Sequence, residues 1–144
     1  MLTGLSKYSG AAARQRGSSP KLQVLNTALL TAQSGLSPEE ARADGEFRGR
    51  LVESAVGAHL TNAAAGGVCD LFYWLDRGRE VDFVLRRGKA VVGIEVKSGR
   101  SPRTLPGMQA FAEAFKPRRV LLVGADGIPL EEFLSRDVAD WLAA

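Results

Sequence analysis

The sequence predicts an α/β domain in which a mixed central β-sheet is flanked by helices. The order of its periodic segments carries this prediction: a helical pattern, three short strand-like segments, a second helical pattern and a continuously apolar strand. The chain has 144 residues, of which 45% are hydrophobic, which is enough for one domain with a proper core. We therefore expect a single domain over residues 21–144, after a flexible or lead-in arm over residues 1–20 that is rich in Gly, Ala and Ser.

The first half of the domain begins with weak alternation from Lys21 to Leu25, which predicts a short strand. Asn26 is a suitable cap for a helix that runs to about Gln33. The segment Ser37-Pro38-Glu39-Glu40 combines a cap, a first-turn proline and acids near the positive end of the helix dipole, so it predicts a second helix start. A longer helix is expected from about Glu46 to Asn62, with an apolar stripe through Val52, Ala55, Val56 and Leu60.

The second half of the domain holds most of the predicted strands. The expected elements are a strand from Leu71 to Leu75, a hairpin of Arg79–Arg86 and Ala90–Lys97 with its turn at Arg87-Gly88, a helix from about Leu105 to Phe115, a strand from Val120 to Val123, and a last helix from Asp137 to Leu142. Pro117 ends the helix that precedes the last strand.

Composition excludes several classes of protein. A single cysteine cannot form an internal disulfide, and with a single histidine it rules out a Cys/His zinc site in the monomer. We expect a cytoplasmic protein without membrane contact, because the sequence shows neither an export leader nor an apolar run long enough for a bilayer span. The net charge of +3 and the pI of about 9.4 weakly favour a nucleic-acid partner.

The predicted hairpin separates its apolar and polar side chains. If Arg86 pairs with Lys89, Asp82 lies opposite Gly93, and paired residues share a face of the sheet. One face then collects the apolar residues Val81, Phe83, Leu85, Val92, Ile94 and Val96. The other face collects Asp82, Glu95 and Lys97, and a slip of one residue would destroy this separation.

Two carboxylates on one sheet face predict a cation. Like charges at close range repel each other unless a cation compensates them, and hard oxygen ligands suit Mg²⁺ or Mn²⁺. Lys97 points the same way as Glu95 and could neutralise a phosphate or orient an attacking water. Glu53, on the long helix between Gly49 and Gly57, has bare turns on either side that would let a metal or a nucleic-acid backbone approach. The alternative interpretation is a solvated sheet face that happens to carry the same residues.

Several stretches of the chain together resemble a known family. They are SPKLQVLNTALL at 19–30, FRGRLVE at 47–53, FYW at 72–74, REVDFVL at 79–85 and IEVKSG at 94–99. They resemble DUF4143, the C-terminal domain of a large prokaryotic family of AAA-type ATPases, which is similar to restriction endonucleases with the PD-(D/E)xK signature. The resemblance implies a restriction-endonuclease-like fold.

The resemblance also implies a role for each site residue. Glu53 corresponds to the helix acid, Asp82 and Glu95 to the two strand acids, and Lys97 to the motif lysine. The Val96 carbonyl would be a further metal ligand, whereas Gln109 matches a helix glutamine only weakly and an exposed helix edge is the better interpretation. Asp82 follows a valine instead of a proline, and the chain holds no GxxxxGK[ST] loop for an ATPase half.

Function follows as two expectations. The first is Mg²⁺- or Mn²⁺-dependent phosphodiester hydrolysis of DNA or RNA through Glu53, Asp82, Glu95 and Lys97, with Arg86, Arg87 and Arg100 contacting phosphates. The alternative is a non-catalytic nucleic-acid-binding, regulatory or docking domain of an AAA-type ATPase system that retains a relic of the site. Possible protein partners are the ATPase domain or a second copy of the chain.

Overall fold

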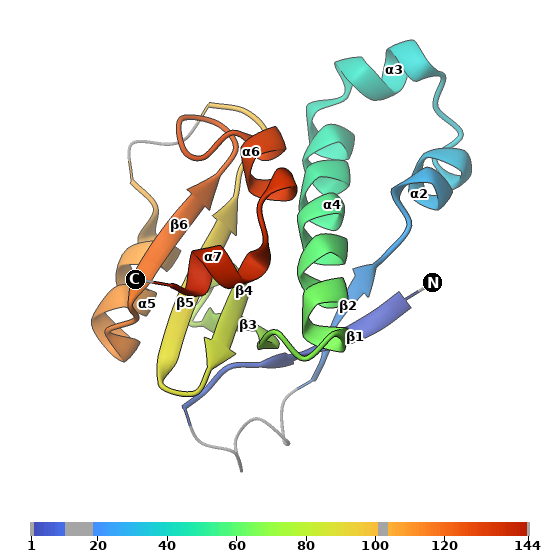
Figure 1. The fold of residues 1–144 in the computed structure, drawn as a ribbon. Helices are drawn as coiled ribbons and strands as arrows, with labels where there is room; N and C mark the ends of the chain where they lie inside the picture. Colours follow the sequence, from blue (N-terminus) through green and yellow to red (C-terminus); the bar gives the residue numbers. More distant parts are fainter. Residues whose placement is uncertain (1, 11–18, 101–103, 144) are drawn as a thin grey trace.

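The central sheet of the computed structural model is mixed and has six strands in the part of the chain that it describes, residues 2–10, 19–100 and 104–143 (Figure 1). The strands are β1 (Leu2–Lys7), β2 (Lys21–Val24), β3 (Asp70–Asp76), β4 (Arg79–Arg87), β5 (Ala90–Val96) and β6 (Arg119–Val123), in the spatial order β2-β1-β3-β4-β5-β6. β1 runs parallel to β3 and β5 parallel to β6, while the other neighbours are antiparallel. The predicted α/β class with helices around a mixed sheet is therefore confirmed.

Five of the six helices in the described residues begin near the sequence signals that predict them. The six helices are α2 (Thr27–Gln33), α3 (Pro38–Ala43), α4 (Gly45–Ala65), α5 (Pro106–Phe115), α6 (Leu130–Ser135) and α7 (Val138–Leu142). The Asn26 side chain caps α2, and Ser37 and Glu40 form a reciprocal capping box at α3. Among the residues described, no helix combines the length and apolar character that a membrane span requires.

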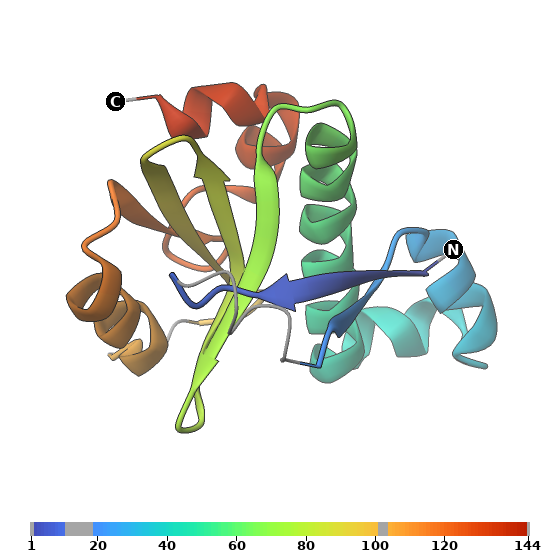
Figure 2. The ribbon, with the colours of Figure 1, turned by 90° about the horizontal axis from the view of Figure 1, so that it is seen from below.

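Two hydrophobic clusters hold helices against opposite faces of the sheet. The larger cluster joins α4, α6 and α7 to the strands and includes Val56, Phe83 and Phe133. The smaller cluster packs α5 against the other face and includes Phe111 and Trp74. Figure 2 shows α4 and α5 on opposite sides of the sheet. The long helix that carries Glu53 and the helix whose N-terminus faces Glu95 therefore lie on different sides of β4.

The β4–β5 hairpin has a different register from the predicted one. Arg87 pairs with Ala90, so the turn consists of Gly88 and Lys89, and Gly88 adopts the left-handed conformation at φ +60°. Gly93 accordingly pairs with Val84 and not with Asp82. The error is two residues, and because side chains alternate with a period of two, it leaves the two faces of β5 as predicted.

A β-bulge in β4 changes the face of one predicted core residue. The pairing with β3 shifts within this stretch, as two pairs show: Phe72 opposite Val84, and Trp74 opposite Val81. β4 therefore has an extra residue, at Asp82 and Phe83, where β3 has one. As a result Val81 packs with the α5 cluster, whereas Phe83 packs with the α4 cluster, so the prediction that the two share a face is wrong.

The N-terminal segment differs from the predicted arm. Residues 2–7 form β1, which pairs with both β2 and β3. Leu5 and Tyr8 are buried, and Tyr8 contacts Phe72 edge-to-face with ring centroids 5.6 Å apart. These apolar anchors are separated by small and polar residues, which is why composition alone indicated a loose segment. The rest of the predicted arm, residues 1 and 11–18, lies outside the described residues, and α6 is an element that the sequence did not predict.

Candidate functional site

Asp82, Glu95 and Lys97 line one pocket of about 250 Å³ between β4, β5 and the beginning of α5. Gly107 allows this arrangement, because a Cβ at that position would lie 1.9 Å from the Glu80 carbonyl oxygen. Any larger residue would push the first turn of α5 away from β4. The structure thus brings together three of the predicted site residues and places a helix N-terminus beside them.

Glu95 is buried on β5, with only 10% of its side chain exposed. Its Oε1 lies 2.8 Å from the Lys97 ammonium. Its Oε2 is buried and has no hydrogen-bond partner among the described residues. An unpartnered buried carboxylate oxygen costs free energy, so this atom is poised for a cation or a donor.

Asp82 lies in the β4 bulge, where the two strands of the hairpin separate. The last pair of the β4–β5 ladder is Phe83 with Ile94, and two residues further on the Val96 amide donates to Asp82 Oδ2 at 2.8 Å. The Asp82 carboxylate therefore accepts the hydrogen bond that a backbone carbonyl of β4 would accept if the ladder continued. Burial and the negative charges of Glu95 and Glu53 raise the pKa of Asp82 to about 7, although the Val96 amide and Lys21 act in the opposite direction.

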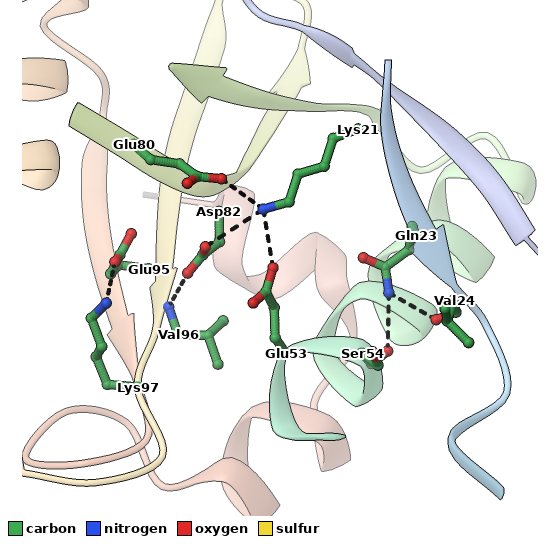
Figure 3. A network of polar contacts seen from close by, with 10 residues as sticks. All are labelled: Lys21, Gln23, Val24, Glu53, Ser54, Glu80, Asp82, Glu95, Val96 and Lys97. Atoms are coloured by element: carbon green, nitrogen blue, oxygen red, sulfur yellow. Dashed lines mark hydrogen bonds and ion pairs between the residues drawn. The ribbon is translucent and has the colours of Figure 1, made fainter. Parts of the chain in front are cut away.

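Lys21 is the residue of this site that the sequence did not indicate. Its ammonium lies 2.7 Å from Glu80 Oε1, 3.1 Å from Glu53 Oε1 and 3.8 Å from Asp82 Oδ1 (Figure 3). Burial alone would lower the pKa of Lys21, but the hydrogen bond to Glu80 and the charge of Glu53 raise it overall, so Lys21 is a cation at neutral pH. Lys21 precedes Glu53 by 32 positions, and no local pattern shows that β2 would pass this helix.

Glu53 joins the site through Lys21, not through the pocket. The two flanking glycines of α4, which we expected to admit a ligand, admit other parts of the chain. A Cβ at Gly57 would lie 2.4 Å from the Gln23 amide, and a Cβ at Gly49 would lie 3.3 Å from Ser98 Oγ. Gln23 is buried and donates to the Val24 and Ser54 carbonyls. These close contacts hold β2 against α4 and so carry Lys21 to Glu53.

Lys97 is a fixed positive charge at the mouth of the pocket. Partial burial would lower its pKa, but the hydrogen bond and charge of Glu95, with the charges of Asp82 and Glu53, raise it overall. A lysine with a raised pKa stays protonated at neutral pH and cannot accept a proton. Lys97 can therefore stabilise negative charge, and it does not act as a general base.

The described residues contain no group of three or more His, Cys, Asp or Glu side chains arranged to hold a metal ion. Lys21 provides a physical reason, because its ammonium lies among Glu53, Glu80 and Asp82 and spaces their oxygens at hydrogen-bonding distances. Mg²⁺ needs ligand oxygens at about 2.0–2.1 Å. Asp82, Glu95 and Glu80 line a common pocket, and because Glu80 is paired with Lys21 at 2.7 Å, Asp82 and Glu95 are the two carboxylates best placed for a cation.

The predicted phosphate-contacting arginines do not form one group. Arg86 and Arg87 lie at the turn end of the hairpin, four and five residues along β4 from Asp82, or roughly 13–17 Å. Arg86 is also engaged, because it donates to Asp70 and lies over the Phe72 ring at 5.0 Å from its centroid. Arg100 is exposed and follows Lys97 at the site end of β5.

The remaining predicted residues have ordinary structural roles. Gln109 is exposed on α5 and donates to Glu113 one turn along the helix, which confirms the expected helix edge. Tyr73 and Trp74 are buried in the two opposite clusters, so neither offers a ring for base stacking. Val96 is buried and contributes its amide to Asp82.

Comparison with known proteins identifies a family without an assigned activity. The model of a domain of unknown function, DUF4143, matches residues 48–135, which is more than half of the chain. No curated protein and no solved structure matches the chain. The matched region includes Glu53, Asp82, Glu95 and Lys97, and Lys21 lies outside it. By this match the chain belongs to the DUF4143 family.

Proposed function

We propose that this domain hydrolyses phosphodiester bonds of nucleic acid with a divalent cation, as a member of the PD-(D/E)xK restriction-endonuclease-like superfamily. The observation that carries the proposal is the buried Glu95 Oε2, which lacks a partner in a pocket shared with Asp82 and Lys97. Selection for stability alone would remove such an oxygen or give it a donor. Such an oxygen beside a second acid and a lysine is what a cation-dependent site requires.

The donor set fits Mg²⁺ or Mn²⁺. Asp82 and Glu95, which line the pocket, would hold the ion, and the family resemblance implies the Val96 carbonyl as a further ligand. Mg²⁺ commonly binds through one or two carboxylates and keeps several waters, so Asp82 and Glu95 suffice although Glu80, the third acid of the pocket, is paired with Lys21. When bound, such an ion lowers the pKa of a coordinated water and neutralises phosphate charge.

The chain's own residues supply the rest of the chemistry. Lys97, held by Glu95 at 2.8 Å, presents a permanent positive charge where a scissile phosphate would gain negative charge. The first turn of α5 directs its positive end into the same pocket. The β4 bulge fixes Asp82 through the Val96 amide, which reduces the reorganisation needed when a substrate arrives.

A second candidate function is favoured by one observation, the Lys21 ammonium among the acids. A site in which a lysine compensates the carboxylates could be a relic, and the domain would then serve as a binding or docking module for an AAA-type ATPase. The family resemblance to the C-terminal part of such ATPases supports this partner. A second copy of the chain is the other candidate partner.

A cleavage assay separates the two functions. Plasmid, single-stranded and branched DNA, and an RNA hairpin, would be incubated with the purified chain in Mg²⁺, Mn²⁺ or EDTA. The nuclease proposal predicts cleavage of at least one substrate with metal only, and none by the variant Glu95→Gln. Glu39→Gln is the matched control, because Glu39 is exposed on α3 and lies outside the site. Cleavage that persists in Glu95→Gln, or binding of nucleic acid without any cleavage, would contradict the nuclease proposal.

A further inference from the structure

We propose that the Lys21 ammonium occupies the position of a second cation, so that this domain takes a single divalent ion and would take two if Lys21 were removed. The inference deepens the proposed function, because the first ion at Asp82 and Glu95 belongs to it. The second position is defined by Glu53, Glu80 and Asp82, which come from α4 and β4.

The Lys21 ammonium lies at ion-pair distances from several acidic side chains. Carboxylate oxygens of Glu80, Glu53 and Asp82 approach one nitrogen at 2.7, 3.1 and 3.8 Å. Their side chains converge on the ammonium from two elements, as Figure 3 shows. Three carboxyl groups face one ammonium, so the acids of the group outnumber its cation. A surface ion pair has no need of three partners, whereas a cation site does.

A separate observation indicates where the first cation belongs. Glu95 Oε2 is buried and unpartnered on the other side of Asp82, in a pocket that Lys21 does not line. Asp82 therefore lies between a filled position and an open one, with its two oxygens engaged differently. Oδ1 is the oxygen nearest to Lys21, and Oδ2 accepts from the Val96 amide.

Lys21 is held in place by the packing of strand β2 as well as by the ion pairs of its own side chain. Two residues further along β2, the Gln23 amide packs against Gly57 and donates to the Ser54 carbonyl, next to Glu53 in sequence. Strand β2 in turn pairs with β1, where Leu5 lies opposite Lys21 and is buried in the larger core cluster. The ammonium is thus delivered by packed backbone, as expected for a group that substitutes for an ion.

Mn²⁺ binding tests the inference without any need for catalysis. The wild type and Lys21→Met would be titrated with Mn²⁺, and bound ions counted by electron paramagnetic resonance and calorimetry. We expect one ion per wild-type chain and two per Lys21→Met chain. Lys21→Arg, which keeps the positive charge, should remain at one. Lys89→Met is the matched control, because Lys89 is exposed in the hairpin turn and should also leave one site.

A double variant tests the ligands of the second position. Glu80 lines the pocket of the first ion but is not among the expected ligands of that ion, so Glu80→Gln in the Lys21→Met background should weaken chiefly the added site. Circular dichroism would confirm folding, and Lys21→Gln replaces Lys21→Met if the latter unfolds. An unchanged ion count in a folded Lys21 variant would overturn the inference.

The wild type keeps the two proposals distinguishable. If it binds no ion while Lys21→Met binds one, the metal part of the proposed function fails, and only the inference that Lys21 occupies the position of a cation stands. If it already binds two ions, the inference is overturned and the metal part of the proposed function survives. If neither protein binds an ion, both are overturned.

Discussion

The two sides of Asp82 compensate carboxylate charge in different ways. On the β2 side, Glu53 and Glu80 both contact Lys21, a residue 32 and 59 positions away in sequence. On the β5 side, Glu95 contacts Lys97, only two residues along the same strand, and keeps one oxygen without a partner. We call the first side closed, because the fold brings Lys21 to it, and the second side open, because it keeps an unpartnered oxygen where we propose a cation.

This difference shows how one fold can build a charge cluster that is paired through tertiary packing beside one that keeps an unpartnered oxygen. The closed side depends on tertiary packing, because β2 must pass α4 at the glycine where the Gln23 amide fits. The open side depends on strand geometry, because residues two apart on β5 share a face. The same kinds of side chain therefore serve different purposes according to whether a distant cation reaches them.

The largest expected effect comes from removing an acid of the open side. Asp82→Ala or Glu95→Ala should abolish metal binding and cleavage together, because Mg²⁺ depends on these two carboxylates. Glu80→Ala, on the closed side, should retain the first metal ion and measurable cleavage. Calorimetric Mn²⁺ titration and the plasmid assay measure both quantities. Equal losses in all three variants would show that the two sides do not differ.

A smaller effect is expected from the lysine of the open side. Lys97→Ala should reduce the cleavage rate by about 10²–10³-fold, the usual cost of removing one group that stabilises transition-state charge. Mn²⁺ affinity should change little, because Lys97 is not a ligand, so the loss should be in kcat. Lys97→Arg, which keeps the charge, should restore part of the rate. A loss of metal affinity as large as the loss of rate would assign Lys97 to structure instead.

The sequence predicted the open side more completely than the closed side. Glu95 and Lys97 were assigned to one face by strand alternation, and the structure brings both into one pocket with Asp82. The register error of two residues did not affect that assignment, because side chains on a strand return to the same face every two residues. Alternation failed at Val81, where the extra residue of the bulge reverses the faces, and nothing in the local sequence marks that bulge.

The closed side could not be predicted from the sequence. Lys21 begins a short strand, and its position depends on the order β2-β1-β3 and on the approach of β2 to α4. Both are tertiary properties that no single-segment pattern contains. The glycines beside Glu53 were a real signal of close approach, but the approaching groups are Gln23 and Ser98.

A stability effect that depends on pH should distinguish Asp82 from its neighbours. The pKa of Asp82 rises from its ordinary value of 3.8 to about 7 in the folded chain, chiefly through burial. The folded state therefore binds the proton more tightly than the unfolded state, and stability from this group is lost as the pH rises from about 4 to about 7. In EDTA, Asp82→Asn should match the wild type near pH 4 and exceed it above pH 7.

The raised pKa of Asp82 also sets an upper limit on the stability that Asp82→Asn gains over the wild type above pH 7. A rise of roughly three pKa units corresponds to at most about 4 kcal/mol in the free energy of unfolding, at about 1.4 kcal/mol per unit. Asparagine retains an acceptor for the Val96 amide, so the comparison isolates the charge. Thermal melts at pH 4 and pH 8 measure the difference, and Mg²⁺ should stabilise only the wild type. Equal melting temperatures at pH 8 without metal would contradict the crowding of charge at Asp82.

The smallest effect concerns the arginines, and it shows how far nucleic acid extends from the open side. Each lost phosphate contact should reduce the slope of log affinity against log salt by roughly 0.9 for duplex DNA. Arg100→Gln should do so most clearly, because Arg100 is exposed just beyond Lys97. Arg87→Gln should do so only if the bound duplex spans the roughly 17 Å of β4 from Asp82 to the turn. Arg86→Gln should change the slope least, since Asp70 already compensates its charge.

Fluorescence anisotropy over a salt series gives the three slopes. A ranking with Arg86 and Arg87 above Arg100 would place the nucleic acid at the hairpin turn and away from the acids, which favours a docking module over a nuclease.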